Sequence, residues 1–281
     1  METSKTITVK TMTPLYHADP ETAKLHISKG NAKIGNQIWS FSTLPGDEDH
    51  LLFLRDGEEL LTDIPGTCSK NCDACFGKGC YAVNSARMYH KSVIQAWAEN
   101  TVLLRSGRLF KELDAFITEK NSKHPDNPAI KLFRINVSGE VQSGSELMEW
   151  NRLATKHPET TFGLYTKNYE ALEEFMDLLE KAGKAPEPET KARNFVINVS
   201  EWHGIAEPFL EKHPGVFNVF EYDDSNRAGG DEARMVMAMH CPAVTKKGHH
   251  ALNGVTGKPI TCSDCRRCYR QTGERTAVWA H

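Results

Sequence analysis

The stretch that decides the fold is "AIKLFRINVSGE", residues 129–140. Its nearly continuous apolar residues predict a buried strand, and its small and polar end predicts a loop. Ser143 lies three residues after this stretch and Glu146 three residues after Ser143, a spacing typical of a helix start. The helix that begins there has an apolar face made of Leu147, Trp150 and Leu153. The stretch therefore predicts one strand-to-helix unit.

The same alternation extends along the chain. Further strands are predicted in residues 36–44, 160–166, 194–200 and 216–222, and a short one around Ile7 and Val9. Helical stripes lie between them, at Leu109, Phe110, Leu113, Phe116 and Ile117, at Leu172, Phe175, Met176 and Leu179 before Gly183, and around Phe209 and Leu210. Alternating strands and helices predict parallel pairing with helical crossovers. We therefore expect an α/β fold, a partial or open barrel-like parallel sheet with helices outside and two cysteine-rich metal loops.

Three regions are expected within the chain. Residues 1–30 form an N-terminal strand and arm, and residues 31–240 form the α/β core with the first cysteine loop at 66–81. Residues 241–281 form a cysteine-rich segment that packs on the core.

Net charge and the lack of long apolar segments argue against several classes of protein. The net charge of -3 argues against a general nucleic-acid binder, although the tail from Thr245 to His281 is locally basic. No segment approaches the ~20 apolar residues of a membrane span. The start, "METSKTITVK", lacks the apolar core of a secretory signal. We therefore expect a cytoplasmic protein without a membrane partner, in a compartment where thiols stay reduced.

Eight cysteines fall into two groups. The first is Cys68, Cys72, Cys75 and Cys80, and the second is Cys241, Cys262, Cys265 and Cys268. In a reducing compartment, such clusters are more often metal ligands than disulfides. Two-residue gaps let successive thiolates turn toward one centre, as in iron–sulfur proteins. Zinc is the alternative metal, although it commonly uses two separated pairs. We expect each group to hold one 4Fe-4S cluster.

Polar residues at strand ends are the candidate substrate contacts, because parallel α/β folds place their sites there. "INVS" occurs at 135–138 and again at 197–200, which is either a coincidence of two buried strands or a pair of polar ends facing one cavity. His240 adjoins Cys241 and is either structural or a metal ligand or proton carrier.

The first group also resembles the radical S-adenosylmethionine enzymes, through the spacing of Cys68, Cys72 and Cys75. Ser138, Gly139 and Glu140 resemble the Gly-Gly-Glu segment of those enzymes. The resemblance implies S-adenosylmethionine as cofactor, with Glu140 on its amine. Ala74 stands where an aromatic residue is usual, and Cys80 adds a fourth thiol.

A longer resemblance covers about residues 30 to 270. The motifs "GNAKIGNQIWSFSTLPG", "RINVSGE", "LYTK", "CPA" and "CSDCRRCY" resemble the phage and mobile-element gene product eighty-eight family. The cysteines of that family's pattern correspond to Cys68, Cys75, Cys80, Cys241, Cys262, Cys265 and Cys268, whereas Cys72 is an addition. The resemblance implies an intracellular, metal-binding protein of mobile-element origin, in the host cytoplasm if phage-encoded. It implies no particular reaction.

Three functions follow as hypotheses. The leading one is an iron–sulfur protein in electron transfer or a redox reaction, with an unidentified redox partner or small-molecule substrate near Glu140. The second is a radical S-adenosylmethionine-like enzyme. The third is a zinc-stabilised module whose basic tail contacts nucleic acid or a partner protein.

Overall fold

The computed structural model describes residues 12–31, 34–54, 59–69, 80–123, 126–185, 189–201, 204–223, 239–243 and 251–279. Within these residues, eight strands form one mostly parallel sheet in the order β1-β2-β3-β4-β5-β6-β8-β7. The strands are β1 (Ser28–Asn31), β2 (Gly35–Ser40), β3 (Leu132–Ile135), β4 (Thr161–Thr166), β5 (Phe195–Glu201), β6 (Asn218–Asp223), β7 (Met239–His240) and β8 (Arg275–Trp279). The helices are α1 (Tyr81–Met88), α2 (His90–Arg105), α3 (Leu109–Ser122), α4 (Gly144–Lys156), α5 (Tyr169–Gly183), α6 (Glu207–Lys212), α7 (Cys262–Cys265) and the 3-10 turn η3 (Arg267–Tyr269).

The predicted strand and helix alternation is confirmed from β3 to β6, and the mixed α/β class with it. One detail differs from the expected sheet. β1 pairs with β2 in the antiparallel sense, and β2 begins only a few residues after β1 ends. The described strands form an open order, as expected for a partial or open sheet. The expected strand around Ile7 and Val9 lies outside the described residues.

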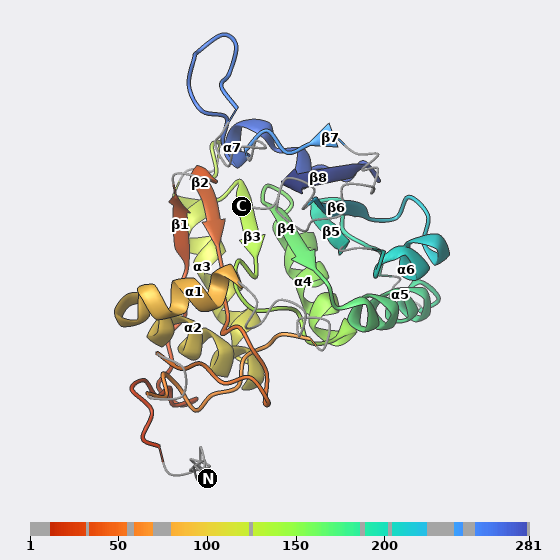
Figure 1. The fold of residues 1–281 in the computed structure, drawn as a ribbon. Coiled ribbons are helices and arrows are strands. Elements are labelled where there is room, and N and C mark those ends of the chain that lie inside the picture. Colours follow the sequence, from red (N-terminus) through yellow and green to blue (C-terminus); the bar gives the residue numbers. More distant parts are fainter. Residues whose placement is uncertain are drawn as a thin grey trace, which may run out of the picture.

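Successive residues of each strand point to opposite faces, so the sheet has two different coverings. Phe133, Phe162 and Phe195 belong to the large core that includes α2 to α6. Leu132 points the other way and packs with Ile34, Ile38, Tyr269 and Cys262. Figure 1 shows α4 and α5 on one side of the strands and α7 on the other. The C-terminal cysteine segment therefore covers the face that the large helices leave open.

Local signals explain where two helices begin. The Ser143 hydroxyl accepts the Glu146 N–H (3.1 Å), which confirms the predicted helix start of α4. The Glu146 carboxylate accepts the N–H of Gln142, one residue before the cap, instead of that of Ser143 itself. Asn168 caps α5 by accepting the Ala171 N–H and donates its amide to the Val141 carbonyl. This second bond ties the loop after β3 to the start of α5.

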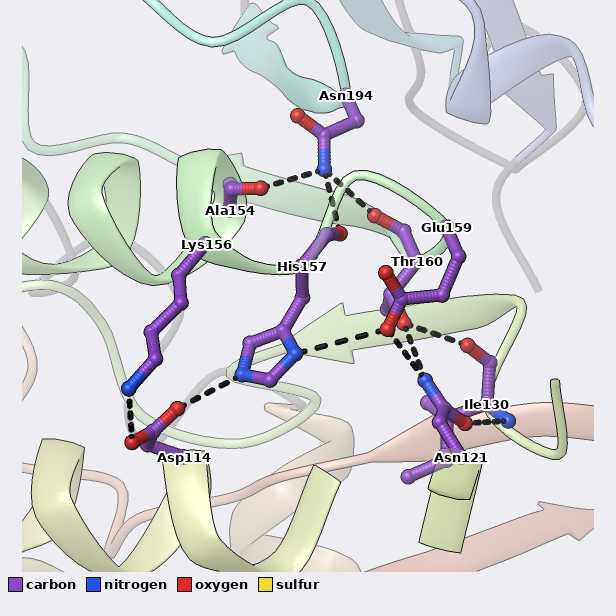
Figure 2. Close-up of polar contacts among 9 residues, drawn as sticks. All are labelled: Asp114, Asn121, Ile130, Ala154, Lys156, His157, Glu159, Thr160 and Asn194. Carbon is purple, nitrogen blue, oxygen red and sulfur yellow. Dashed lines mark hydrogen bonds and ion pairs between the residues drawn. The ribbon is translucent and has the colours of Figure 1, made fainter. Parts of the chain in front are cut away.

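A dense polar network holds the edge of the sheet where the strands begin (Figure 2). The His157 ring lies 2.9 Å from Asp114 and 3.5 Å from Glu159. The Asn194 amide donates to the carbonyls of Ala154, His157 and Thr160. The network fastens the ends of α3 and α4 to the starts of β4 and β5. Hydrogen bonds and ion pairs between side chains therefore stabilise this edge of the sheet.

Candidate functional site

The four C-terminal cysteines are brought together on the sheet face that the large helices do not cover. Cys262 and Cys265 flank the single turn of α7, and Cys268 lies in η3. Arg266 between them adopts a left-handed conformation (φ 55°), which ends α7 and turns the chain back. Cys241 follows β7, and its N–H donates to the Ala277 carbonyl of β8. Two pieces of chain thus contribute the four thiols, one after β7 and one that forms α7 and η3.

The pKa of Cys268 reports this convergence. Burial, together with the nearby sulfurs of Cys241, Cys262 and Cys265, raises it to about 12, against the opposing hydrogen bond with Tyr165. Because only thiolate charges repel one another, this effect places the three other sulfurs within electrostatic range of Cys268. Among the described residues, however, no group of three or more His, Cys, Asp or Glu side chains is arranged to hold a metal ion. The structure therefore does not confirm the two metal loops of the predicted fold.

Two asparagines of the sheet anchor the C-terminal segment. The Asn198 amide donates to the carbonyls of Leu164 and Cys268, both at 3.0 Å. The Asn218 amide donates to the Arg270 carbonyl (2.8 Å). Its oxygen accepts the N–H groups of Thr272 (2.9 Å) and Gly273 (3.0 Å). Asn198, the second asparagine of the repeated "INVS", therefore positions a cysteine, a role that the sequence did not reveal.

Arg134 of β3 lies within electrostatic range of Tyr81 and Cys262. Its guanidinium lies 4.7 Å from the centre of the Tyr165 ring. Burial alone would lower the pKa of Arg134, but Tyr165, Tyr81, Tyr269 and Cys262 act together to raise it. Tyr81 directly follows Cys80 of the first group, whereas Cys262 belongs to the second. The positive charge of Arg134 therefore acts on Cys262 and on the residue that follows Cys80.

His240, beside Cys241, is held by its own contacts. Its Nε2 lies 2.8 Å from the buried carboxylate of Asp223. Its ring stacks on Trp279 of β8, with 3.9 Å between the ring centres. These contacts fix the orientation of the residue that precedes Cys241.

The described cysteines of the first group, Cys68 and Cys80, lie near the edge where the strands end. The Cys68 N–H donates to the Gly46 carbonyl (2.8 Å), and the Gly46 N–H donates to the Cys68 sulfur (3.2 Å). Cys80 precedes α1 and packs against the main core. Cys72 and Cys75 lie outside the described residues. The six described cysteines form no disulfide with one another.

The loop after β3 contacts the segment that carries Cys68. The Glu140 N–H donates to the Thr67 hydroxyl (2.9 Å), and the Thr67 and Thr43 hydroxyls hydrogen-bond at 2.7 Å. Gly139 has a φ of 78°, and a side chain there would collide with both threonine hydroxyls. Only glycine fits this close approach.

The Glu140 carboxylate is engaged within the chain. It accepts the Thr166 hydroxyl (2.6 Å) and the Lys167 N–H (3.0 Å). Burial raises its pKa, against the opposing charge of Lys167 and these hydrogen bonds. Glu140 thus joins the loops after β3 and β4. The sequence had suggested that this carboxylate contacts a cofactor amine, whereas its contacts in the structure are with Thr166 and Lys167.

A separate groove of about 720 Å³ lies among α2, the α2–α3 turn, α4 and α5, and contains none of the predicted site residues. Glu146 lines it, and burial raises the pKa of this carboxyl to about 7, against the hydrogen bonds from Gln142 and Trp150.

No described helix is both long and apolar enough to cross a membrane.

Comparison with known proteins identifies the family. The model of the gene product 88 family matches residues 24–271, in agreement with the resemblance seen in the sequence. No curated protein and no solved structure matches the chain. The similarity to radical S-adenosylmethionine enzymes finds no support in these comparisons and stays a prediction. Because the match spans most of its length, the chain belongs to the gene product 88 family.

Proposed function

We propose that this protein is an iron–sulfur protein whose two cysteine groups each hold a 4Fe-4S cluster, and that it works in electron transfer or a redox reaction. The observation that carries the proposal is the proximity of Cys241, Cys262 and Cys265 to the half-buried Cys268, as β7, α7 and η3 bring these segments to the same side of the sheet. Neutral thiols gain little from such crowding, whereas metal binding favours the thiolate forms and holds them together.

The donor set of the C-terminal group fits an iron–sulfur cluster. All four candidate ligands are thiols, which iron–sulfur clusters take as their ligands. Bound there, a cluster would supply one-electron transfer. The Tyr165 hydroxyl hydrogen-bonds to Cys268, and the Arg134 charge acts on Cys262. Hydrogen bonds and positive charge near the sulfurs stabilise the more negative, reduced state of such a centre.

The first group would be completed by Cys72 and Cys75, with Cys68 and Cys80 as the described ligands. The Gly46 N–H that already donates to the Cys68 sulfur would stabilise a thiolate there. The loop Ser138–Glu140 contacts Thr67, the residue before Cys68. A small-molecule substrate at this loop would therefore lie next to the first cluster.

Metal analysis of protein purified without air tests the proposal. We expect about eight iron atoms and as many acid-labile sulfides per chain, because each cluster holds four of each. Cys268→Ala should lose about half of both, and Cys68→Ala should lose the other half. Ser263→Ala is the matched control, because Ser263 lies in α7 between two of the proposed ligands. This variant should keep its iron.

Each other outcome has a clear meaning. Protein that contains no iron and no sulfide, before and after anaerobic reconstitution, contradicts the proposal. Stoichiometric zinc with salt-sensitive DNA or RNA binding would favour the zinc-stabilised module. Formation of 5′-deoxyadenosine from S-adenosylmethionine by the reduced protein would favour the radical-type enzyme.

A further inference from the structure

Buried side-chain polar atoms that lack a hydrogen-bond partner gather at one place in the described part of the chain. They are Ser69 Oγ, Arg134 Nε, Asn136 Oδ1, Asn136 Nδ2 and Ser138 Oγ. Buried polar groups are nearly always partnered in folded proteins, so a group of exceptions requires an explanation. At the other edge of the sheet, by contrast, the side chains of His157 and Asn194 are engaged (Figure 2).

These four residues come from two segments that lie against each other. Arg134, Asn136 and Ser138 occupy alternate positions at the end of β3 and in the loop that follows. Ser69 comes two residues after Thr67, which hydrogen-bonds to the Glu140 N–H of the same loop. The unpartnered atoms therefore border the edge of the sheet where β3 ends, next to the first cysteine group.

The charge of this place is positive. Arg134 makes no salt bridge within the described residues, and its close neighbours are aromatic rings and a thiol. A guanidinium stays protonated in proteins. Arg134 is half-buried and its Nε is shielded from water, so its charge is costly without a counter-charge, and an anion would offset that cost.

The backbone at Asn136 supports a functional role. Asn136 has a φ of 49° and is 95% buried, with both of its amide atoms unpartnered in the described part of the chain. Asparagine tolerates the left-handed region better than most residues, but the conformation is still uncommon. Strained residues of this kind cluster at ligand sites, where the surrounding structure holds them in place.

We infer that Ser69, Arg134, Asn136 and Ser138 bind the oxyanion group, a carboxylate or a phosphate, of a small molecule. The planar guanidinium matches such groups through paired N–H donors. The amide N–H group and the two serine hydroxyls add further donors. The remaining atom, Asn136 Oδ1, is an acceptor, so the ligand carries a hydroxyl or amino donor beside its oxyanion. The site does not require the proposed clusters.

Calorimetric titration of the intact protein tests the inference. Inorganic phosphate and malonate are the two probes, and potassium chloride at equal ionic strength is the reference for screening. We expect saturable binding of at least one probe. Arg134→Met should weaken that binding at least tenfold. Arg134→Lys should weaken it less, because lysine keeps the positive charge but lacks the paired N–H donors of the guanidinium.

Asn136→Gly provides a second variant in case Arg134→Met does not fold. Glycine accepts the φ of 49° without strain and removes only the amide. It should weaken probe binding several-fold. Arg152→Met is the matched control, because Arg152 is an exposed arginine that pairs with Glu149 and Glu189. Its affinity for the probe should equal that of the wild type.

Binding of only one probe supports the inference and identifies the anion class. The inference is overturned if the wild type binds neither probe beyond the chloride reference. It is also overturned if Arg134→Met and Asn136→Gly bind as tightly as the wild type. Iron content, measured on the same samples, separates the two proposals. A chain without iron that binds phosphate through Arg134 contradicts the clusters and supports the anion site.

Discussion

Asn218 is the residue whose loss should most directly loosen the C-terminal cysteine segment. Its side chain is buried, with 4% exposed, and it hydrogen-bonds to three backbone groups of that segment, at Arg270, Thr272 and Gly273. Asn218→Ala removes these three bonds. Water can reach the segment in part, because Arg270 and Thr272 are exposed, so each loss should cost about 1 kcal/mol. The free energy of unfolding should fall by roughly 3 kcal/mol in total.

Urea unfolding measures this loss, and mass spectrometry of native protein treated with a thiol reagent measures its consequence at Cys268. We expect the thiol reagent to label Cys268 faster in Asn218→Ala than in the wild type. The reason is that Cys268 lies in the segment that Asn198 and Asn218 hold to the sheet. Thr272→Ala is the matched control. Thr272 is exposed, and its loss leaves the three backbone bonds of Asn218 in place, so this variant should lose less. A midpoint and a labelling rate equal to those of the wild type would refute the anchoring role of Asn218.

Three further variants test other parts of the fold. The pKa of Glu146 is raised to about 7, so the native state binds this proton more tightly than the unfolded chain does. The free energy of unfolding should therefore fall by up to about 3 kcal/mol as the pH rises from 4.5 to 7. In urea titrations at several pH values, Glu146→Gln should show a smaller fall in the free energy of unfolding with pH. An equally steep fall in the variant and the wild type would contradict this role of Glu146. Gly163→Ala would place a Cβ 2.7 Å from the Tyr269 ring, so it should cost roughly 1–3 kcal/mol, and an unchanged thermal midpoint would show that the ring moves freely. Thr67→Val leaves the buried Glu140 N–H without its acceptor and should cost about 1–3 kcal/mol in urea, whereas a loss below about 0.5 kcal/mol would indicate another partner.

The local elements could be predicted from the sequence because their signals are local. The apolar run of residues 129–135 encodes β3, and the Ser143 cap encodes the start of α4. Gly183 ends α5 as expected. Spacing within a few residues is enough for such elements, since their hydrogen bonds and their buried faces repeat along the chain. The two cysteine groups were equally visible as patterns.

The arrangement of the site depended on contacts between residues far apart in the sequence. β8 enters the sheet between β6 and β7, and no periodicity encodes that order. Asn198 and Asn218 hold a segment that lies more than fifty residues further along the chain. Arg134 becomes unusual only because folding surrounds it with Tyr165 and Cys262.

The sequence by itself thus determined the α/β alternation, the start of α4 and the inventory of thiols, because each depends on neighbours along the chain. Only the tertiary structure decided which face the cysteine segment covers, that Glu140 is engaged by Thr166, and that the end of β3 keeps unpartnered polar atoms. The physical reason is that burial and partnership are properties of the space around a side chain, and distant segments create that space.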